Sequence, residues 1–115
     1  MTNHLQVLAD LLKANKIQWL NYWFEICQYD DHWPDLGGVY VFTGRNPWGF
    51  HWEPFYIGTT HSFQQRMSWH EKWWSAQRLG ATHVHALVER DPFLRDMIER
   101  ELVRAYQPPL NDQLR

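Results

Sequence analysis

The segments Gly38–Thr43, with the sequence GVYVFT, and Phe55–Gly58, with the sequence FYIG, decide how this chain is expected to fold. Both are rich in β-branched and aromatic residues, which favour β-strands. The residues between them, 45–54, contain two prolines and a glycine and therefore predict a loop that joins two strands. Alternate side chains of a strand point to opposite faces, so Tyr40 is expected on the face opposite Val41.

The sequence after these two strands predicts two helices and a third strand. Ser62 is a good N-cap for a helix that runs to about Leu79, where a glycine ends it. Residues 82–88 alternate in character and predict a strand, and an Asp-Pro pair then opens a helix from residue 91 to about Tyr106. The prediction is an α+β fold: a small antiparallel three-stranded sheet flanked by helices, in the order β-β-α-β-α.

Residues 1–36 have a different pattern. Apolar residues recur there at helical spacing in two runs: Leu5, Leu8 and Leu12, then Ile17, Leu20, Trp23 or Phe24, and Cys27. We therefore expect an N-terminal helical extension over residues 1–36, packed on a domain that spans residues 37–115. The extension has two lysines against five Asp or Glu, a net charge of −3, whereas the rest has nine basic against eight acidic residues, a net charge of +1.

Composition excludes several classes of protein. With 115 residues the chain has the length of one domain, and 44% hydrophobic against 21% charged residues is typical of a folded protein rather than a disordered one. A single cysteine, Cys27, excludes an internal disulfide and a cysteine-based zinc site. No apolar run is long enough to span a membrane, and no segment reads as a secretory signal. We expect a cytoplasmic protein.

Two tripeptides carry a resemblance to a known family. Gly38-Val39-Tyr40 and Tyr56-Ile57-Gly58 resemble the two signature motifs of the GIY-YIG endonuclease superfamily. Arg66 lies eight residues after Gly58, as the catalytic arginine of that family does. His70 follows four residues later, where several members have a histidine or a tyrosine.

The end of the chain extends the resemblance. Residues 98–103 and then Pro108–Asn111 are similar to the closing motif of the family, in which an apolar residue precedes the metal-binding glutamate, here Glu99. A proline-containing turn and an asparagine, here Asn111, complete that motif. The resemblance covers about residues 37–111, and Gly38 and Asn111 are expected to be structural residues near the site.

The resemblance implies a divalent-metal-dependent endonuclease that hydrolyses phosphodiester bonds of DNA, with RNA as the alternative substrate. It implies one Mg²⁺ or Mn²⁺ ion held by Glu99, with Arg66 on the scissile phosphate and Tyr40 as the candidate general base. Tyr56 would hold or polarise the nucleophile or the phosphate, and His70 would assist. Products with 5′-phosphate and 3′-hydroxyl ends are implied as well.

These residue types suit the chemistry. A single carboxylate surrounded by water and substrate oxygens is typical of Mg²⁺, and the planar arginine fork matches a phosphate. An unperturbed tyrosine has a pKa of about 10, so Tyr40 would need help from the metal, Arg66 or His70. Arg66 and His70 are i and i+4, which places them on one side of the predicted helix. Glu99 is expected at the margin of the apolar stripe of the last helix, although Glu101 could equally be a surface residue.

The aromatic content of 17%, with 8 tryptophans, suggests surfaces that stack on bases. The candidate nucleic-acid contacts are Gly58, Trp48, Trp52 and Trp69. The loop that carries Trp48 and Trp52 joins the two signature strands, at the expected mouth of the site, or alternatively covers the N-terminal helices. Trp74 is expected in the core. His83 and His85 share one strand face, for which ordinary packing is preferred to a metal site.

A second class of function stays open at this stage. The domain expected over residues 37–115 has a net charge of only +1, so specificity for nucleic acid would have to come from the aromatic loop, from residues 1–36, from a homodimer or from a partner protein. The alternative to a nuclease is a catalytically silent GIY-YIG-fold module that binds nucleic acid or a protein.

Overall fold

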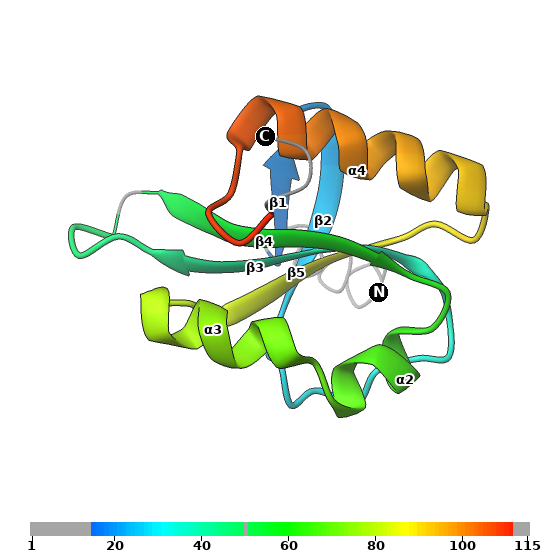
Figure 1. Cartoon of the computed structure of the whole chain (residues 1–115), viewed down its shortest axis with the longest axis horizontal. Helices are drawn as coiled ribbons and strands as arrows, with labels where there is room; N and C mark the ends of the chain where they lie inside the picture. The colour runs from blue at the N-terminus through cyan, green and yellow to red at the C-terminus, as the bar shows by residue number, and fades with distance from the viewer. Residues whose placement is uncertain (1–14, 50, 112–115) are drawn as a thin grey trace, which may run out of the picture.

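The computed structural model describes residues 15–49 and 51–111 (Figure 1). The first apolar run, Leu5 to Leu12, lies outside these residues. The described elements follow in this order: β1 (Lys16–Trp19), β2 (Tyr22–Cys27), β3 (Gly38–Arg45), β4 (Trp52–Thr60), α2 (Phe63–Ser68), α3 (Glu71–Leu79), β5 (His83–Val88) and α4 (Pro92–Tyr106).

The strands form one antiparallel sheet in the order β1-β2-β5-β3-β4. The α+β class and the antiparallel pairing are confirmed, but the prediction of three strands is wrong because the sheet has five. The two additional strands, β1 and β2, come from the segment predicted as the second helix of the extension. β2 pairs directly with β5, opposite Ala86 and Val84, so residues 16–27 are part of the same sheet as the signature strands.

The hairpin of β1 and β2 explains why a helical prediction was wrong there. Ile17 pairs with Phe24, and Trp19 pairs with Tyr22, so alternate residues of both strands share one face. Leu20, which completes the apparent helical spacing, lies instead in the turn with a φ of 54° and is 41% exposed. The helical spacing of the apolar residues was therefore misleading, because one of them, Leu20, lies in a tight turn.

Helices cover both faces of the sheet, as Figure 1 shows, with α4 on one side and α2 and α3 on the other. The face under α2 and α3, here called the aromatic face, buries Tyr40, Phe42 and Phe63. The face under α4, here called the aliphatic face, buries Val39, Val41, Ile57, Ile98 and Leu102. The predicted alternation along β3 is confirmed by this division.

The helix predicted from Ser62 to Leu79 is in fact two helices. Ser62 caps α2 through its side chain, as predicted, but α2 ends at Ser68 and α3 begins at Glu71. His70 stands between them as the N-cap of α3, because its ring nitrogen Nδ1 accepts from the Lys72 amide at 3.1 Å. The break changes which residues face the core.

Trp73, not Trp74, is buried by this arrangement, and the prediction for Trp74 is wrong since it is 41% exposed. The last helix begins and ends as predicted, with Asp91 as N-cap and Tyr106 as its final residue. In the described part of the chain, every helix falls short of the length and apolar character needed to cross a lipid bilayer.

Candidate functional site

The two signature strands bring Tyr40 and Tyr56 together on the aromatic face. Their ring centroids are 6.2 Å apart, and Tyr40 is almost fully buried, with 1% of its surface exposed. Tyr40 pairs across the strands with Gly58, where a Cβ atom would lie 2.5 Å from the tyrosine oxygen. A Cβ on Gly38 would lie 2.1 Å from the carbonyl oxygen of Leu87. The two glycines are therefore needed for the close approach that this site requires.

His70 contacts Tyr40 from the junction of α2 and α3. The Nε2 atom of His70 lies 2.6 Å from the Tyr40 hydroxyl oxygen. Burial lowers the pKa of His70 to about 4, so the ring is neutral near pH 7. Because Nδ1 accepts from the Lys72 amide, the single ring proton belongs on Nε2, which donates to the Tyr40 oxygen. His70 reaches the site from the N-cap of α3 rather than from the helix that carries Arg66, which corrects the predicted i, i+4 pair.

Arg66 approaches the tyrosines from α2. Its guanidinium forms an ion pair with Glu71 at 3.1 Å and donates to the carbonyl oxygen of Trp69 at 3.2 Å. The hydrogen bond from Arg66 lowers the pKa of Glu71 to about 2. Burial raises the pKa of Tyr40, while the positive charge of Arg66 acts in the opposite direction. A cation therefore lies close enough to stabilise a Tyr40 phenolate.

Glu99 comes to the same site from α4. It is half-buried, and burial raises the pKa of its carboxyl, with a smaller effect from the negative charge of Asp96. The Glu99 charge in turn contributes to the raised pKa of Tyr56, after burial. Glu101, two residues later, is different because it accepts a hydrogen bond from Tyr22 on the exposed surface. The structure thus separates the two glutamates that the sequence left equivalent.

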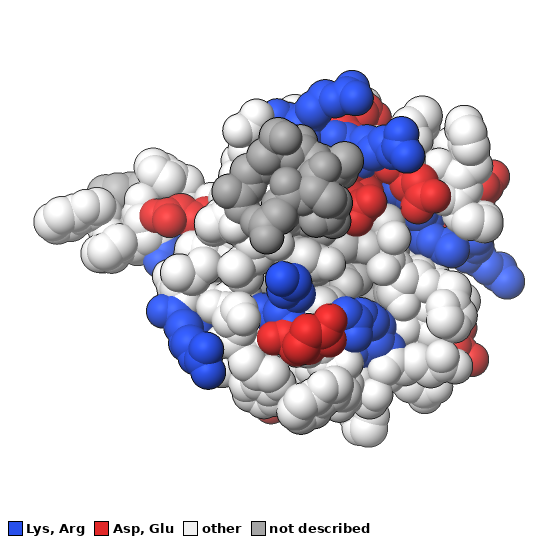
Figure 2. Space-filling model, viewed as in Figure 1, with Lys and Arg blue, Asp and Glu red and all other residues white. Residues whose placement is uncertain are grey.

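Residues of α2 and α4 border a cleft at the end of the edge strand β4. The cleft between them has a volume of about 440 Å³ and is lined by Thr59, Thr60, His61, Gln65, Arg66, Arg95 and Asp96. Figure 2 shows acidic and basic side chains next to one another on this side of the molecule, with no continuous basic patch. Side chains of both charge signs therefore line this cleft.

The Glu99 carboxylate is a candidate ligand for a divalent cation. Among the described residues the Glu99 carboxylate has no hydrogen bond or ion pair, and no three His, Cys, Asp or Glu side chains group together as a metal cage. A hard cation such as Mg²⁺ often takes one or two protein carboxylates and keeps its waters, which matches one half-buried glutamate beside an open cleft. Asp96, one turn before Glu99, adds negative charge at the same place.

Asn111 fixes the edge strand that carries Tyr56. Its side-chain oxygen accepts from the Ile57 amide at 2.8 Å, and its side-chain nitrogen donates to the Ile57 carbonyl at 2.7 Å. The neighbouring amide of Leu110 donates to the Phe55 carbonyl at 3.0 Å. The segment after α4 thus pairs with the free edge of β4, on both sides of Tyr56.

Comparison with solved structures identifies a shared fold. The chain is similar to the GIY-YIG N-terminal endonuclease domain of UvrC from Thermotoga maritima bound to its catalytic divalent cation, magnesium, with a TM-score of 0.57 and 22% identity. Point mutants of that domain with an Asn-to-Ala or a Tyr-to-Phe change match with TM-scores of 0.57 and 0.56 and identities of 21% and 23%. Each match covers 70% of this chain and 88% of the other. The chain has the GIY-YIG fold.

Comparison by sequence alone identifies no relative of this kind. No model of a known protein family matches the chain, and no curated protein matches it either. The resemblance of the two tripeptides is therefore confirmed by structure, at the level of the GIY-YIG fold, while the similarity of sequence is low.

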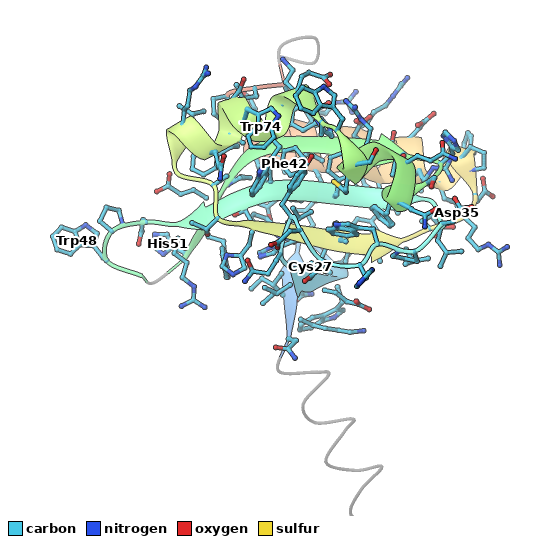
Figure 3. All side chains as sticks on the ribbon, turned by 90° about the horizontal axis from the view of Figure 1, so that it is seen from below. Cys27, Asp35, Phe42, Trp48, His51 and Trp74 are labelled. Carbon is cyan, nitrogen blue, oxygen red and sulfur yellow. The ribbon has the colours of Figure 1, made fainter. Side chains whose placement is uncertain are left out.

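The tryptophans proposed as nucleic-acid contacts are spread over this GIY-YIG fold. Trp48 is 78% exposed at the tip of the β3–β4 hairpin and points away from the body of the molecule in Figure 3. Trp52 packs against the aliphatic face, where Arg45 lies 4.7 Å over its ring. Trp69, which is 65% exposed, follows α2 directly and lies 6.0 Å from Trp74. Trp69 is therefore the one of the three that the fold places beside Arg66.

The two histidines of β5 belong to the aliphatic face rather than to the site. His85 is fully buried, and its Nδ1 atom accepts from the Trp19 indole at 2.9 Å. His83 lies 5.1 Å from the Trp52 ring and contacts Thr82. Both imidazoles are thus engaged in packing and hydrogen bonding with neighbours that do not bind metals.

Sequence reasoning missed the pairing of Arg66 with Glu71. On one continuous helix, residues five apart lie on different sides, so the pair had no signal. The break at His70 turns the chain and brings the two side chains together. Asp96 could have been found, because it lies three residues before Glu99 on a predicted helix and therefore on the same side.

Proposed function

We propose that this protein is a divalent-metal-dependent endonuclease that hydrolyses phosphodiester bonds of DNA, by a mechanism that uses one metal ion. The observation that carries the proposal is the meeting of four side chains from four elements of a GIY-YIG fold. The charges of Arg66 and Glu99 both act on the pKa values of Tyr40 and Tyr56, and Arg66 lines a cleft with polar walls. Magnesium in the similar UvrC domain supports the choice of cation.

In this proposal Glu99 holds the cation, and Arg66 binds the scissile phosphate. The bound cation would supply positive charge that neutralises the phosphate and lowers the pKa of a coordinated water. The Arg66 guanidinium, now paired with Glu71, would exchange that exposed carboxylate for phosphate oxygens. An ion pair so exposed to solvent contributes little, so the exchange has a low cost.

Tyr40 takes the proton of the attacking water in the proposed reaction. Tyr40 first releases its own proton to solvent. The phenolate oxygen then accepts the proton of the water, the water oxygen bonds to phosphorus, and the bond from phosphorus to the 3′-oxygen breaks. The leaving oxygen then takes a proton from solvent. His70, as a neutral donor to the Tyr40 oxygen, stabilises the phenolate and fixes its orientation. Tyr56 would hold the water or the phosphate on the cleft side.

The test uses purified protein, supercoiled plasmid and Mg²⁺ or Mn²⁺, with EDTA as a parallel control. We expect nicking or cutting that requires the metal and that Glu99→Ala and Tyr40→Phe each lower by about 1,000-fold or more, since each removes a group needed in the transition state. Glu101→Gln is the matched control on the same helix and should keep activity, because Glu101 bonds to Tyr22 away from the cleft.

Retained cleavage in Glu99→Ala protein would contradict the assignment of the metal ligand. If the wild type leaves plasmid intact, single-stranded, branched and RNA substrates are tested next, since RNA is the second candidate substrate. Folding of every variant is checked by circular dichroism.

A catalytically silent binding module is the second candidate. The pairing of Arg66 with Glu71 and the burial of Tyr40 favour it, because both groups are occupied or covered in this state. The exposed Trp48, Trp69 and Trp74 would then form contacts with a protein or with bases. This candidate predicts binding of nucleic acid or of a partner protein that Arg66→Ala and Glu99→Ala leave intact, and no cleavage of any substrate.

A further inference from the structure

The cleft across β4 contains a second arginine that the residue pattern of the sequence did not single out. Arg95 lies in the first turns of α4 and lines the cleft on the wall opposite Arg66. It is i and i+4 with Glu99, so both side chains lie on one side of α4. The helix rises 1.5 Å per residue, which places Arg95 about 6 Å along the axis from the proposed metal ligand.

The guanidinium of Arg95 is held from one side. Its Nη1 atom donates to the carbonyl oxygens of Arg90 at 3.0 Å and Glu89 at 3.3 Å, in the connection between β5 and α4. A Cβ atom on Gly37 would lie 2.6 Å from the same Nη1, so the glycine before the first signature motif leaves the space that Arg95 fills. These contacts fix the side chain at the cleft before any ligand binds.

No described neighbour neutralises the charge of Arg95. Arg66 forms an ion pair with Glu71, whereas Arg95 forms none with any residue of the segments 15–49 and 51–111. Its bonds to the protein run through Nη1 to neutral carbonyls, and a guanidinium has five N–H donors. Asp96 lies in the same cleft, but it is the neighbour whose negative charge acts on Glu99, on the side of the proposed cation.

The described residues that line the rest of the cleft include no other strong cation. The residues that follow the second signature motif are Thr59 and Thr60, which are neutral, and Gln65 and His61 complete that wall. Consecutive nucleotides of one strand advance about 3.4 Å along a duplex axis, so a separation of about 6 Å corresponds to one or two nucleotides. A strand whose scissile phosphate meets Arg66 and Glu99 would thus bring a neighbouring phosphate to Arg95.

We propose that Arg95 binds a second backbone phosphate of the strand that is cut, one or two nucleotides from the scissile bond, through the free side of its guanidinium. The inference rests on the proposed nuclease function for the identity of the ligand. In this proposal α4 supplies the positive charge for this phosphate, because Thr59 and Thr60, which also line the cleft, are neutral. Arg95 positions the substrate and takes no part in bond breaking.

Binding of a short fluorescent DNA duplex, measured by anisotropy at several salt concentrations, tests the inference. We compare wild type with Arg95→Gln, Arg95→Lys and Arg104→Gln, the last being an exposed arginine in the last turn of α4. Arg95→Gln should weaken binding about tenfold and lower the slope of log K against log salt by about 0.9, the value for one lost phosphate contact. Arg95→Lys should recover the slope, and Arg104→Gln should leave it unchanged.

A duplex with one neutral methylphosphonate at each position near the cleavage site then locates the contact. The wild type should bind more weakly when the methylphosphonate replaces one particular phosphate. Arg95→Gln should show little further weakening with that duplex, because the variant already lacks the contact. In cleavage assays Arg95→Gln should raise KM and leave kcat within about twofold, as expected for binding that is uniform between ground and transition state. Thermal melting verifies that each variant is folded.

The outcomes separate this inference from the proposed function. Equal binding by Arg95→Gln and Arg104→Gln, in a protein that cleaves DNA, overturns the Arg95 contact alone. A wild type that binds DNA through Arg95 but cleaves no substrate retains the contact and overturns the nuclease. A wild type that binds no DNA at low salt overturns both.

Discussion

The two faces of the sheet each bury one histidine, and the two histidines differ in what they do. His70 on the aromatic face and His85 on the aliphatic face are both fully buried, and burial lowers both pKa values, to about 4 and about 3. Both ring nitrogens of His70 have partners, one in the Lys72 amide and one in Tyr40. His85 bonds to Trp19 through Nδ1, while its Nε2 has no hydrogen-bond partner among the described residues.

The comparison shows that burial and a lowered pKa do not identify a functional residue on their own. His85 has the larger shift, but it lies among Trp19, Trp52 and the valines of the aliphatic face, without a link to Arg66 or Glu99. His70 has the smaller shift, and it bonds to Tyr40, whose pKa is in turn affected by Arg66 of the cleft wall. The connection, rather than the size of the shift, distinguishes a candidate site from a packed core.

Acidification should destabilise both faces, and this is the largest effect that we expect. The folded pKa of each histidine lies below the ordinary value of 6.5, so the unfolded chain binds protons first as the pH falls. The stabilisation is complete above about pH 6.5 and is lost toward pH 4, on the order of 3 kcal/mol for each histidine. Urea unfolding at several pH values measures it, and a flat profile over this range would contradict the burial of both rings.

Asn111 hydrogen-bonds to the edge strand β4, which contributes residues to both faces of the sheet. Replacement of Asn111 should therefore lower both stability and activity. Asn111→Ala removes two hydrogen bonds to Ile57 and leaves the amide and carbonyl of that residue unpaired. We expect a loss of about 2 to 3 kcal/mol in the free energy of unfolding. The control Asn21→Ala, at an exposed turn, should cost less than about 0.5 kcal/mol. Denaturant unfolding of the two variants measures both losses of stability.

Replacement of each histidine by phenylalanine should show which face of the sheet contributes to activity. His70→Phe removes the donor to Tyr40 and should lower kcat about 100-fold, whereas His85→Phe should change kcat less than about twofold. The pH profile of kcat in His70→Phe should move to higher pH, because the Tyr40 phenolate is less stabilised. His70→Gln, which keeps a donor, should recover part of the activity. Equal kcat values for the two phenylalanine variants would remove His70 from the mechanism.

Trp19→Phe gives the smallest expected effect and concerns the aliphatic face alone. The change removes the indole donor and leaves Nδ1 of His85 buried without its partner. We expect a loss of about 1 to 2 kcal/mol in stability and no change in cleavage. Tyr22→Phe, which removes a surface bond to Glu101, is the control and should cost less. A fall in kcat for Trp19→Phe would mean that a change on the aliphatic face alters the candidate site.

Several features of the fold could be predicted because they depend on local sequence. Ser62 and Asp91 are caps with short acceptor side chains, and both begin helices where the pattern indicated. The alternation of Val39, Tyr40, Val41 and Phe42 defines two faces of a strand, whatever its neighbours are. The break at His70 had no local signal, because a histidine that caps a helix is rare as a sequence pattern.

The sequence by itself determined the order of the signature strands, the periodicity of α4 and the residue types of the candidate site, since these follow from propensity, caps and spacing along the chain. Only the tertiary structure decided that β1 and β2 join the sheet, that the charge of Glu99 acts on both signature tyrosines while Glu101 bonds to Tyr22, and that His70 contacts Tyr40. Each of these depends on contacts between residues far apart in the chain. Short apolar runs fit a helix or a strand equally well, and pairing with β5 selects the strand.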